Sequence, residues 1–368
     1  MSHWIQPLIA WTNKGLYCAA GGFYIDPHRA VETAIVTHAH SDHARRGSQK
    51  YYFEASGVGL LKSRPGSRIG AQGIPYGQKF RLGDVEISLH SAGHILGSAQ
   101  VRVEHRGEVW VASGDYKRDP DPSCEPFESV RCDTFITEAT FGTPKYLWEK
   151  NRAHGLDIYE WWQTNAAAGR NSVLFGYSLG KAQRILAELA PFAQRPVVIH
   201  ETIHDLTECY RQVGRVLAPT RVLPALGNGT AALPGFDLPE MRGELILAPP
   251  SILRTEWLAR LGRFHTAFAS GWMQGASFAH GSRYDYGFVL SDHADWSDIN
   301  RTIDECGARR VFVQHRDGAL VRHLRRRGLD ARPLCGPCLT RGRRGGSSRR
   351  SVRLRVVALR PRCCGFER

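Results

Sequence analysis

Short apolar runs alternate with polar, glycine-containing turns through the first part of the chain. Residues 8–25 alternate apolar and polar positions, which predicts short antiparallel strands. The run Thr33–Val36 predicts a buried strand, and a helix is expected to begin near Asp42. Hairpins are predicted over residues 79–89 and 99–113. We therefore expect this part of the chain to be rich in β-structure.

The pattern changes at about residue 145. From there to residue 283, helices alternate with apolar runs, which is typical of a parallel α/β unit. The chain then returns to a strand over residues 286–291, followed by a helix to about Cys306, a strand that ends at His315 and a helix to about Arg327. The apolar runs of the α/β unit are residues 173–175, 197–199, 245–247 and 267–269.

Most of the positive charge lies in the last residues. The 368 residues carry a formal net charge of +14, but residues 338–368 contain ten Arg and one Glu, which leaves +5 on the rest. A charge of +5 permits binding to a polyanion and supports it only weakly. The Arg-, Gly- and Ser-rich tail, residues 337–368, offers no apolar face to bury, so we expect it to be disordered and assign it no function.

The composition also predicts a compartment. No apolar run approaches the roughly twenty residues of a membrane helix. The first residues lack a basic segment followed by an apolar one, as a secretory signal would have. Nine cysteines without regular spacing fit reduced thiols better than a disulfide framework. We expect a cytoplasmic protein without a membrane partner.

Four potential metal ligands stand close together after the strand that ends at Val36. They are His38, His40, Asp42 and His43. Imidazole and carboxylate suit zinc and similar divalent ions, and the spacing allows two adjacent ions. The alternative is a polar loop with incidental histidines, which would suffice for one or two of these residues but accounts poorly for four.

Further candidate ligands follow later predicted strands. His94 stands between glycines after one strand, Asp115 follows another, and His315 ends a third. Taken alone, His94 reads more simply as a loop histidine. Because such strand ends gather at one edge of a sheet, their recurrence favours a joint site. Glu138 and His293 also follow predicted strands.

The turn between residues 176 and 181 can bind a phosphate. A glycine turn at a helix N-terminus with a nearby lysine is suited to an anion, which makes Ser178 and Lys181 the candidate contacts. A plain strand-to-helix turn explains the same residues equally well.

These motifs resemble those of the metallo-β-lactamase superfamily. The stretch THAHSDH matches its HxHxDH signature, His94 and Asp115 match its later ligand motifs, and Asp26 matches an early structural aspartate. Glu138 in TEATFG, His293 in LSDHADW and His315 in FVQH resemble the additional motifs of the β-CASP nucleases. The segments FASGWM, GFVLSDHADW and YSLGKAQ are most similar to bacterial ligase-associated DNA exonucleases. The resemblance covers roughly residues 4–333, with Arg316 where a glycine is usual.

The resemblance implies an α/β fold, an αββα metallo-β-lactamase sandwich with an inserted parallel α/β β-CASP domain. The sandwich would comprise residues 1–144 and a return segment, 284–336, with the insertion at 145–283. Two divalent ions are implied, with Zn²⁺ as the first choice and Mn²⁺ as an alternative. Their implied ligands are His38, His40 and His94 for one ion, Asp42, His43 and His315 for the other, and Asp115 between them.

The resemblance also implies roles in catalysis. Asp42 would orient the attacking water, and His293, paired with Glu138, would protonate the leaving oxygen. The implied enzyme hydrolyses DNA from an end during repair, beside a DNA ligase and a helicase. Three alternatives stay open: an RNA-processing nuclease on the same scaffold, a hydrolase of small esters or lactams, and a catalytically silent scaffold that binds nucleic acid.

Overall fold

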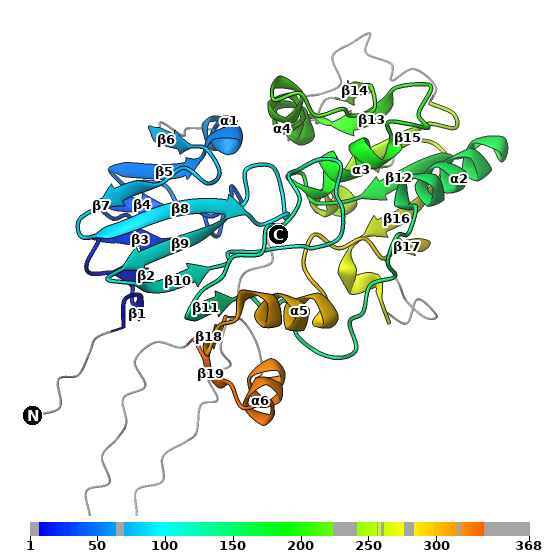
Figure 1. The fold of residues 1–368 in the computed structure, drawn as a ribbon. Helices are drawn as coiled ribbons and strands as arrows, with labels where there is room; N and C mark the ends of the chain where they lie inside the picture. The colour runs from blue at the N-terminus through cyan, green and yellow to red at the C-terminus, as the bar shows by residue number, and fades with distance from the viewer. Residues whose placement is uncertain are drawn as a thin grey trace, which may run out of the picture.

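Three β-sheets organise the part of the chain that the computed structural model describes, namely residues 7–63, 70–223, 241–255, 257–258, 261–275, 283–314 and 318–334 (Figure 1). The first sheet has the order β1-β2-β3-β4-β5-β6, and the second has the order β19-β18-β11-β10-β9-β8-β7. The third has the order β14-β13-β15-β12-β16-β17 and is parallel throughout.

The strands of the first sheet are β1 Ala10–Thr12, β2 Gly15–Cys18, β3 Phe23–Ile25, β4 Thr33–Ile35, β5 Lys50–Glu54 and β6 Ala71–Ile74. Those of the second are β7 Phe80–Leu82, β8 Val85–Ser91, β9 Ala99–His105, β10 Glu108–Ala112, β11 Thr134–Thr137, β18 Arg310–Val313 and β19 Asp330–Pro333. Those of the third are β12 Asn171–Phe175, β13 Val197–His200, β14 Thr220–Leu223, β15 Leu245–Ala248, β16 Phe264–Ala269 and β17 Tyr286–Phe288. The α-helices are α1 Val58–Lys62, α2 His154–Ala167, α3 Lys181–Leu189, α4 Glu201–Gln212, α5 Trp296–Cys306 and α6 Ala319–Arg326.

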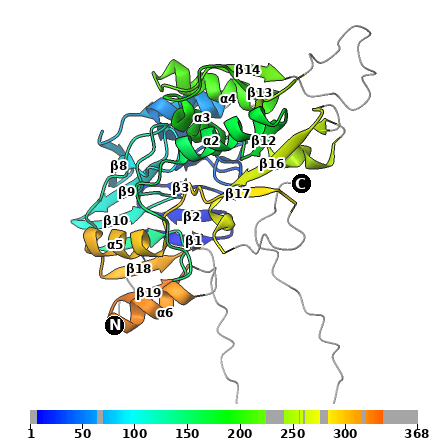
Figure 2. The ribbon, with the colours of Figure 1, turned by 90° about the vertical axis from the view of Figure 1, so that its right-hand side faces the viewer.

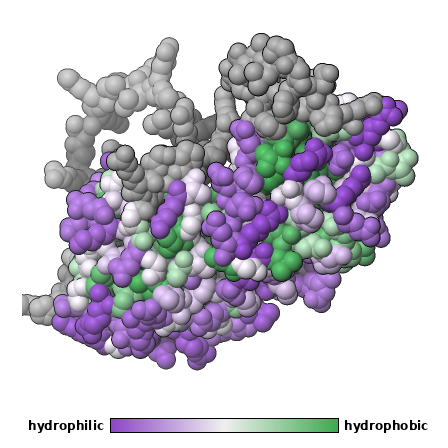
Figure 3. Space-filling view, turned by 90° about the horizontal axis from the view of Figure 1, so that it is seen from above, coloured by the Kyte–Doolittle hydropathy of each residue, from purple (hydrophilic) through white to green (hydrophobic). Residues whose placement is uncertain are grey.

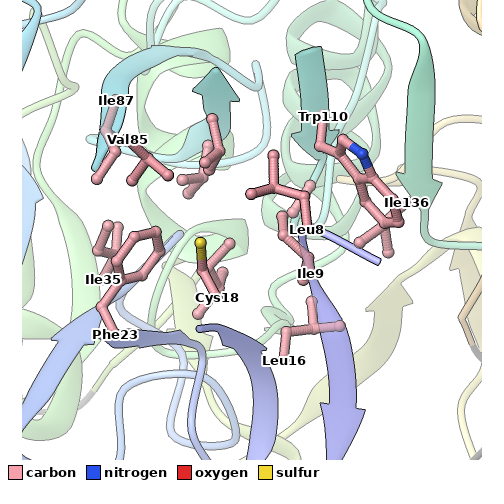
Figure 4. Close-up of a cluster of buried hydrophobic side chains, with 14 of the residues drawn as sticks. Leu8, Ile9, Leu16, Cys18, Phe23, Ile35, Val85, Ile87, Trp110 and Ile136 are labelled. Carbon is pink, nitrogen blue, oxygen red and sulfur yellow. The ribbon is translucent and has the colours of Figure 1, made fainter. Parts of the chain in front are cut away.

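The first and second sheets pack face to face. Phe23 and Ile35 of the first sheet meet Val85 and Ile87 of the second, and Trp110 closes the same cluster (Figure 4). All five side chains are at most 1% exposed. Each fully buried side chain of this kind contributes about 1.5–3 kcal/mol by leaving water. This apolar layer fixes which strand ends share an edge.

Helices cover the outer faces of this sandwich. Along β10, Trp110 points into the core between the sheets, whereas its neighbour Val111 packs on the other face with Ile299 of α5 and Leu324 of α6. The outer face of the first sheet is covered by α1, through Leu60 and neighbouring residues. The predicted αββα sandwich is therefore confirmed.

The third sheet forms the inserted α/β domain. Leu174 of β12 faces Trp162 of α2 and Ile185 of α3, while Val173 and Phe175 face the opposite side. Strands buried on both faces read as continuous apolar runs, which explains why these strands were visible in the sequence. Figures 1 and 2 show the domain at one end of the sandwich, with α2, α3 and α4 packed on its sheet.

Two expectations about elements need correction, and one strand was not expected. No helix begins near Asp42, because the described backbone there makes only a turn, with the His43 N–H donating to the His40 carbonyl at 3.1 Å. Residues 286–288 belong to the third sheet as β17, so the inserted domain extends beyond the predicted boundary at 283. The short strand β19 was not predicted.

The face of the molecule seen from above is largely polar (Figure 3). From above, hydrophilic side chains predominate and apolar side chains form separate patches (Figure 3). Among the described helices, none has the length and apolar character needed to cross a membrane. The predicted disordered tail, residues 337–368, lies outside the described residues.

Candidate metal centre

Asp26 holds the backbone of the histidine-rich turn. It adopts a φ of 45°, in the left-handed region that side-chain-bearing residues rarely occupy. Its carboxylate accepts hydrogen bonds from the Thr37 N–H at 2.8 Å and the Thr37 hydroxyl at 2.6 Å. It also lies 2.7 Å from His43 Nδ1. Asp26 therefore orients both the start of the turn and the ring of His43.

Four potential ligands converge where strands of the two sheets end. His38 and His40 follow β4, His94 follows β8, and Asp115 follows β10. Each offers a ligand atom, and these atoms all lie within 4.8 Å of one another. Asp115 Oδ2 is 3.5 Å from His38 Nε2 and 3.9 Å from His94 Nε2. The sandwich thus joins residues that are far apart in the sequence.

The hydrogen bonds of His40 and His94 leave two lone pairs facing each other. His40 Nε2 lies 3.3 Å from the Leu179 carbonyl, and His94 Nδ1 lies 2.7 Å from the Asp292 carbonyl. Because a carbonyl oxygen only accepts, each of these nitrogens carries the ring proton. The remaining nitrogens, His40 Nδ1 and His94 Nε2, are 3.2 Å apart. In a tetrahedral zinc site, neighbouring nitrogens are about 3.3 Å apart.

His38 contributes a further ring nitrogen without a hydrogen-bond partner to the same cluster. Its Nδ1 lies 3.1 Å from the Thr37 hydroxyl, while its Nε2 is buried without a hydrogen-bond partner. Burial, followed by the neighbouring imidazoles, holds the pKa of His38 well below its usual range, and the same causes act on His94. Neutral imidazoles with inward lone pairs fit a divalent cation.

The second predicted ion has fewer described ligands. His43 Nε2 lies 3.7 Å from both Asp115 Oδ2 and Asp42 Oδ2. The Asp42 side chain is 60% exposed, so it borders the centre from the solvent side. Burial lowers the pKa of His43, but Asp115 and Asp26 outweigh it and raise the pKa to about 10. His315, the last predicted ligand, lies outside the described residues.

Glu138 and His293 form a pair beside this centre. Glu138 is fully buried, and both of its carboxylate oxygens lie 3.0 Å from His293 Nδ1. The Tyr116 N–H donates to the same carboxylate at 2.8 Å. Burial lowers the pKa of His293, but Glu138 outweighs it and raises the pKa to about 9. Potential ligand atoms of Glu138 and His293 lie within 4.8 Å of Asp115, so the pair can act on a group bound there.

The turn before α3 reaches the centre in a way that the sequence did not indicate. It supplies the Leu179 carbonyl that orients His40. Lys181, predicted to bind a phosphate, is instead 2% exposed, and its Nζ lies 2.8 Å from Asp292 Oδ1. Its ammonium is therefore already paired, which corrects that prediction. The Ser178 hydroxyl is half-buried, 3.2 Å from the Thr202 hydroxyl.

The carbonyl groups of Leu179 and Asp292 were also missed as functional groups. Both act through backbone atoms, which residue type does not reveal. Thr37 was missed as well, although it stands directly before the first ligand and its hydroxyl contacts that ligand. A hydroxyl residue next to a predicted metal-binding histidine was the one available signal.

Comparison with known proteins identifies sequences that are similar to this chain. No protein-family model matches the chain. The chain is 33% identical over 323 residues to the protein named Probable DNA ligase from Opitutus terrae, a match that covers 87% of this chain and 30% of that protein. It is 29% identical over 123 residues to Endoribonuclease YSH1 from Kluyveromyces lactis, covering 33% and 16% of the two chains. It is 28% identical over 114 residues to Integrator complex subunit 11 from Danio rerio, covering 30% and 19%.

The chain spans less than a third of the length of each of these relatives. Two further observations agree with these relatives. The sequence motifs occur in the order expected for the family, and the fold is a two-sheet sandwich interrupted by a parallel sheet. The chain belongs to the metallo-β-lactamase superfamily and, within it, to the β-CASP family.

Proposed function

We propose that this protein is a metal-dependent nuclease that hydrolyses DNA from an end. The observation that carries the proposal is the buried Glu138–His293 pair beside the cluster of His38, His40, His94 and Asp115. Hydrolysis of a phosphodiester requires positive charge near the phosphate oxygens and a proton for the leaving oxygen. The two groups of residues offer these functions side by side.

Two divalent ions are proposed to bind, with zinc as the first choice. His38, His40 and His94 would hold one, His43, Asp42 and His315 the other, and Asp115 would contact both. When bound, such ions polarise the phosphate and lower the pKa of an attacking water. Asp26 and the carbonyls of Leu179 and Asp292 hold the imidazoles in the required orientation.

His293 is proposed to protonate the leaving sugar oxygen. Its Nδ1 is directed at Glu138, which leaves Nε2 for the substrate. Because the carboxylate favours the imidazolium, His293 carries its proton at neutral pH. Asp42, at the exposed border of the centre, is proposed to accept a hydrogen bond from the attacking water.

DNA is the proposed substrate because the motifs are most similar to ligase-associated DNA exonucleases, and because a relative named Probable DNA ligase matches over 323 residues. A DNA ligase and a helicase are the proposed partners in repair. A second candidate is RNA processing, which the similarity to Endoribonuclease YSH1 and Integrator complex subunit 11 favours.

The test starts with metal analysis of the purified protein. End-labelled single- and double-stranded DNA and RNA of matched sequence are then digested with zinc or manganese present. Faster release of labelled nucleotides from DNA than from RNA supports the proposal, and the reverse favours RNA processing. Binding to DNA without cleavage under any metal condition indicates a silent scaffold. Absence of binding to every oligonucleotide, with hydrolysis of a model ester or lactam, indicates a small-molecule hydrolase.

A further inference from the structure

An exposed tyrosine belongs to the turn of the inserted domain that contacts the candidate ligand His40. Tyr177 is 46% exposed and belongs to the turn that follows β12. Leu179 of this turn contacts His40, and a Cβ atom placed on Gly180 would lie 3.7 Å from His40 Nε2. The turn therefore touches a candidate ligand directly. Tyr177 stands two residues before Leu179 in this turn.

Contacts with other side chains hold the ring of Tyr177 in place. Its ring makes an edge contact with Phe268 of β16, with centroids 6.4 Å apart and an interplanar angle of 80°. Phe268 is stacked in turn on Tyr284 at 5.1 Å and 16°. Burial and the Asp292 carboxylate raise the pKa of the Tyr177 phenol, which indicates that this carboxylate is near. A pre-positioned ring loses little entropy when it stacks on a ligand.

A second aromatic side chain follows the neighbouring strand. Strands β12 and β16 pair in parallel, with Phe175 opposite Phe268, so the residues after them emerge at the same edge of the sheet. Trp272 follows β16 and lies 4.6 Å from Phe141, whose ring is 6.0 Å from that of His293. In open parallel sheets, ligands bind at the carboxyl ends of the strands.

A cation is available near this edge as well. Lys145 is exposed, and its ammonium lies 4.6 Å from the centre of the Tyr146 ring, which packs on Trp272 at 5.6 Å. Aromatic side chains combined with positive charge bind single-stranded nucleic acid, because bases stack on the rings and phosphates pair with the cations. A small ester or lactam would use neither feature.

We propose that Tyr177 stacks on an unpaired base of the substrate strand, next to the phosphodiester held at the metal centre. The inference rests on the proposed nuclease function and specifies its substrate as a single-stranded or frayed end. Every base has a face that stacks, so the contact tolerates sequence and requires an unstacked base. A blunt duplex end must first open before its terminal base reaches Tyr177.

The test compares variants on labelled single-stranded oligonucleotides in the metal-loaded protein. Tyr177→Ala is expected to lower kcat/KM by about 5- to 150-fold, the range for loss of one stacked base. Tyr177→Phe keeps the ring and should retain most of the activity. The matched control is Tyr286→Ala, because Tyr286 is also 46% exposed but belongs to β17, the outermost strand of the third sheet, and not to the turn that contacts His40.

Oligonucleotides with a single abasic residue locate the contact. For the wild type, kcat/KM should fall when the abasic residue occupies the stacked position, whereas Tyr177→Ala should be indifferent to it. Equal losses in both proteins at every position, or equal effects of Tyr177→Ala and Tyr286→Ala, would overturn the inference. If the wild type cleaves nothing, the nuclease proposal fails. The stacking contact is then tested separately, by measuring the affinity of the protein for intact and abasic oligonucleotides with fluorescence anisotropy. Equal affinity for both oligonucleotides then overturns the stacking contact.

Discussion

Lys181 of the inserted domain forms a buried ion pair with Asp292 of the sandwich, with Nζ and Oδ1 2.8 Å apart. Lys181 also donates to the Leu290 carbonyl, and Arg184, one turn further along α3, donates to the Ser291 carbonyl. Three successive residues before His293 are thus held by one helix. Since the Asp292 carbonyl orients His94, the inserted domain supports the metal centre as well as the Glu138–His293 pair.

Replacing this lysine should destabilise the fold. Lys181→Met leaves the Asp292 carboxylate with less compensation in a buried site, so we expect a loss of about 3–5 kcal/mol in the free energy of unfolding. Urea denaturation followed by circular dichroism measures it. The control is Lys79→Met, because Lys79 pairs with Glu86 while 64% exposed, where a loss of about 1 kcal/mol or less is expected. Similar losses in both variants would contradict the supporting role.

Asp115 should be required for metal binding. Its carboxylate lies between His38, His43 and His94, so Asp115→Ala removes the group shared by the proposed sites. We expect affinity for zinc to fall by more than roughly 100-fold, beyond the effect of losing a ligand's hydrogen-bond partner. Elemental analysis and a competitive chelator titration measure this. Asp84→Ala, in the turn between β7 and β8, should bind like the wild type. A fully metallated Asp115→Ala would contradict the role of the carboxylate.

His293 should be needed for turnover and not for metal. His293→Ala is expected to keep its metal content and to lose activity by a factor of about 100 or more, because proton transfer to the leaving group is removed. A fully active variant would eliminate it as the acid. Circular dichroism of the folded variant excludes a loss of structure as the cause.

Glu138 should set the alkaline limit of activity. Burial disfavours the charged form of His293, but Glu138 outweighs it and raises the pKa to about 9, so the donor stays protonated until the pH approaches that value. The contribution of the pair to the free energy of unfolding depends on pH in the same direction. It is fully present below the ordinary histidine pKa of about 6.5 and is lost as the pH rises through about 9. In Glu138→Gln the alkaline limb of kcat should move to lower pH by about one unit or more. If the alkaline limb of kcat does not move in Glu138→Gln, Glu138 does not set the pKa of the catalytic acid.

Metal uptake should release a proton from His43. Its Nδ1 is directed at Asp26, and the carboxylates of Asp26 and Asp115 raise its pKa, against the effect of burial, to about 10. In the metal-free protein at pH 7.5, His43 is therefore protonated, and a metal ion must displace the proton on Nε2. We expect release of about one proton from this residue and tighter binding as the pH rises towards 10. Calorimetry in buffers of different ionisation enthalpy measures the release, and its persistence in His43→Ala would assign the proton elsewhere.

The strand ends that build the centre could be predicted because their ligands follow apolar runs. His38, His94 and Asp115 each stand just after such a run, and parallel or paired strands bring their ends together. Glu138 and His293 were paired in advance through the family motifs alone. In the structure, His293 Nδ1 lies 3.0 Å from the Glu138 carboxylate, which is hydrogen-bonding distance. The roles of the two residues in catalysis stay predictions.

The parts that could not be predicted depend on contacts between domains. The lysine at the start of α3 has the same residue type and position whether it faces a phosphate or a buried aspartate, and only the packing of α3 on the sandwich decides. The turn at His40 lacks a helix because the Asp26 carboxylate, from a distant strand end, holds Thr37 and His43. Strand β17 was assigned to the sandwich because its partner, β16, could not be read from local sequence.

The pairing of β11 with β18 affects how the protein is made. Phe135 lies opposite Val311 in this ladder, yet the whole inserted domain separates the two strands in the sequence. On the ribosome, β11 therefore emerges with one edge unpaired and waits until β18 has been synthesised. An unpaired central strand invites association with other chains, and a nascent chain that stalls within the inserted domain is at risk of aggregation. Chaperone demand should peak in that interval of translation.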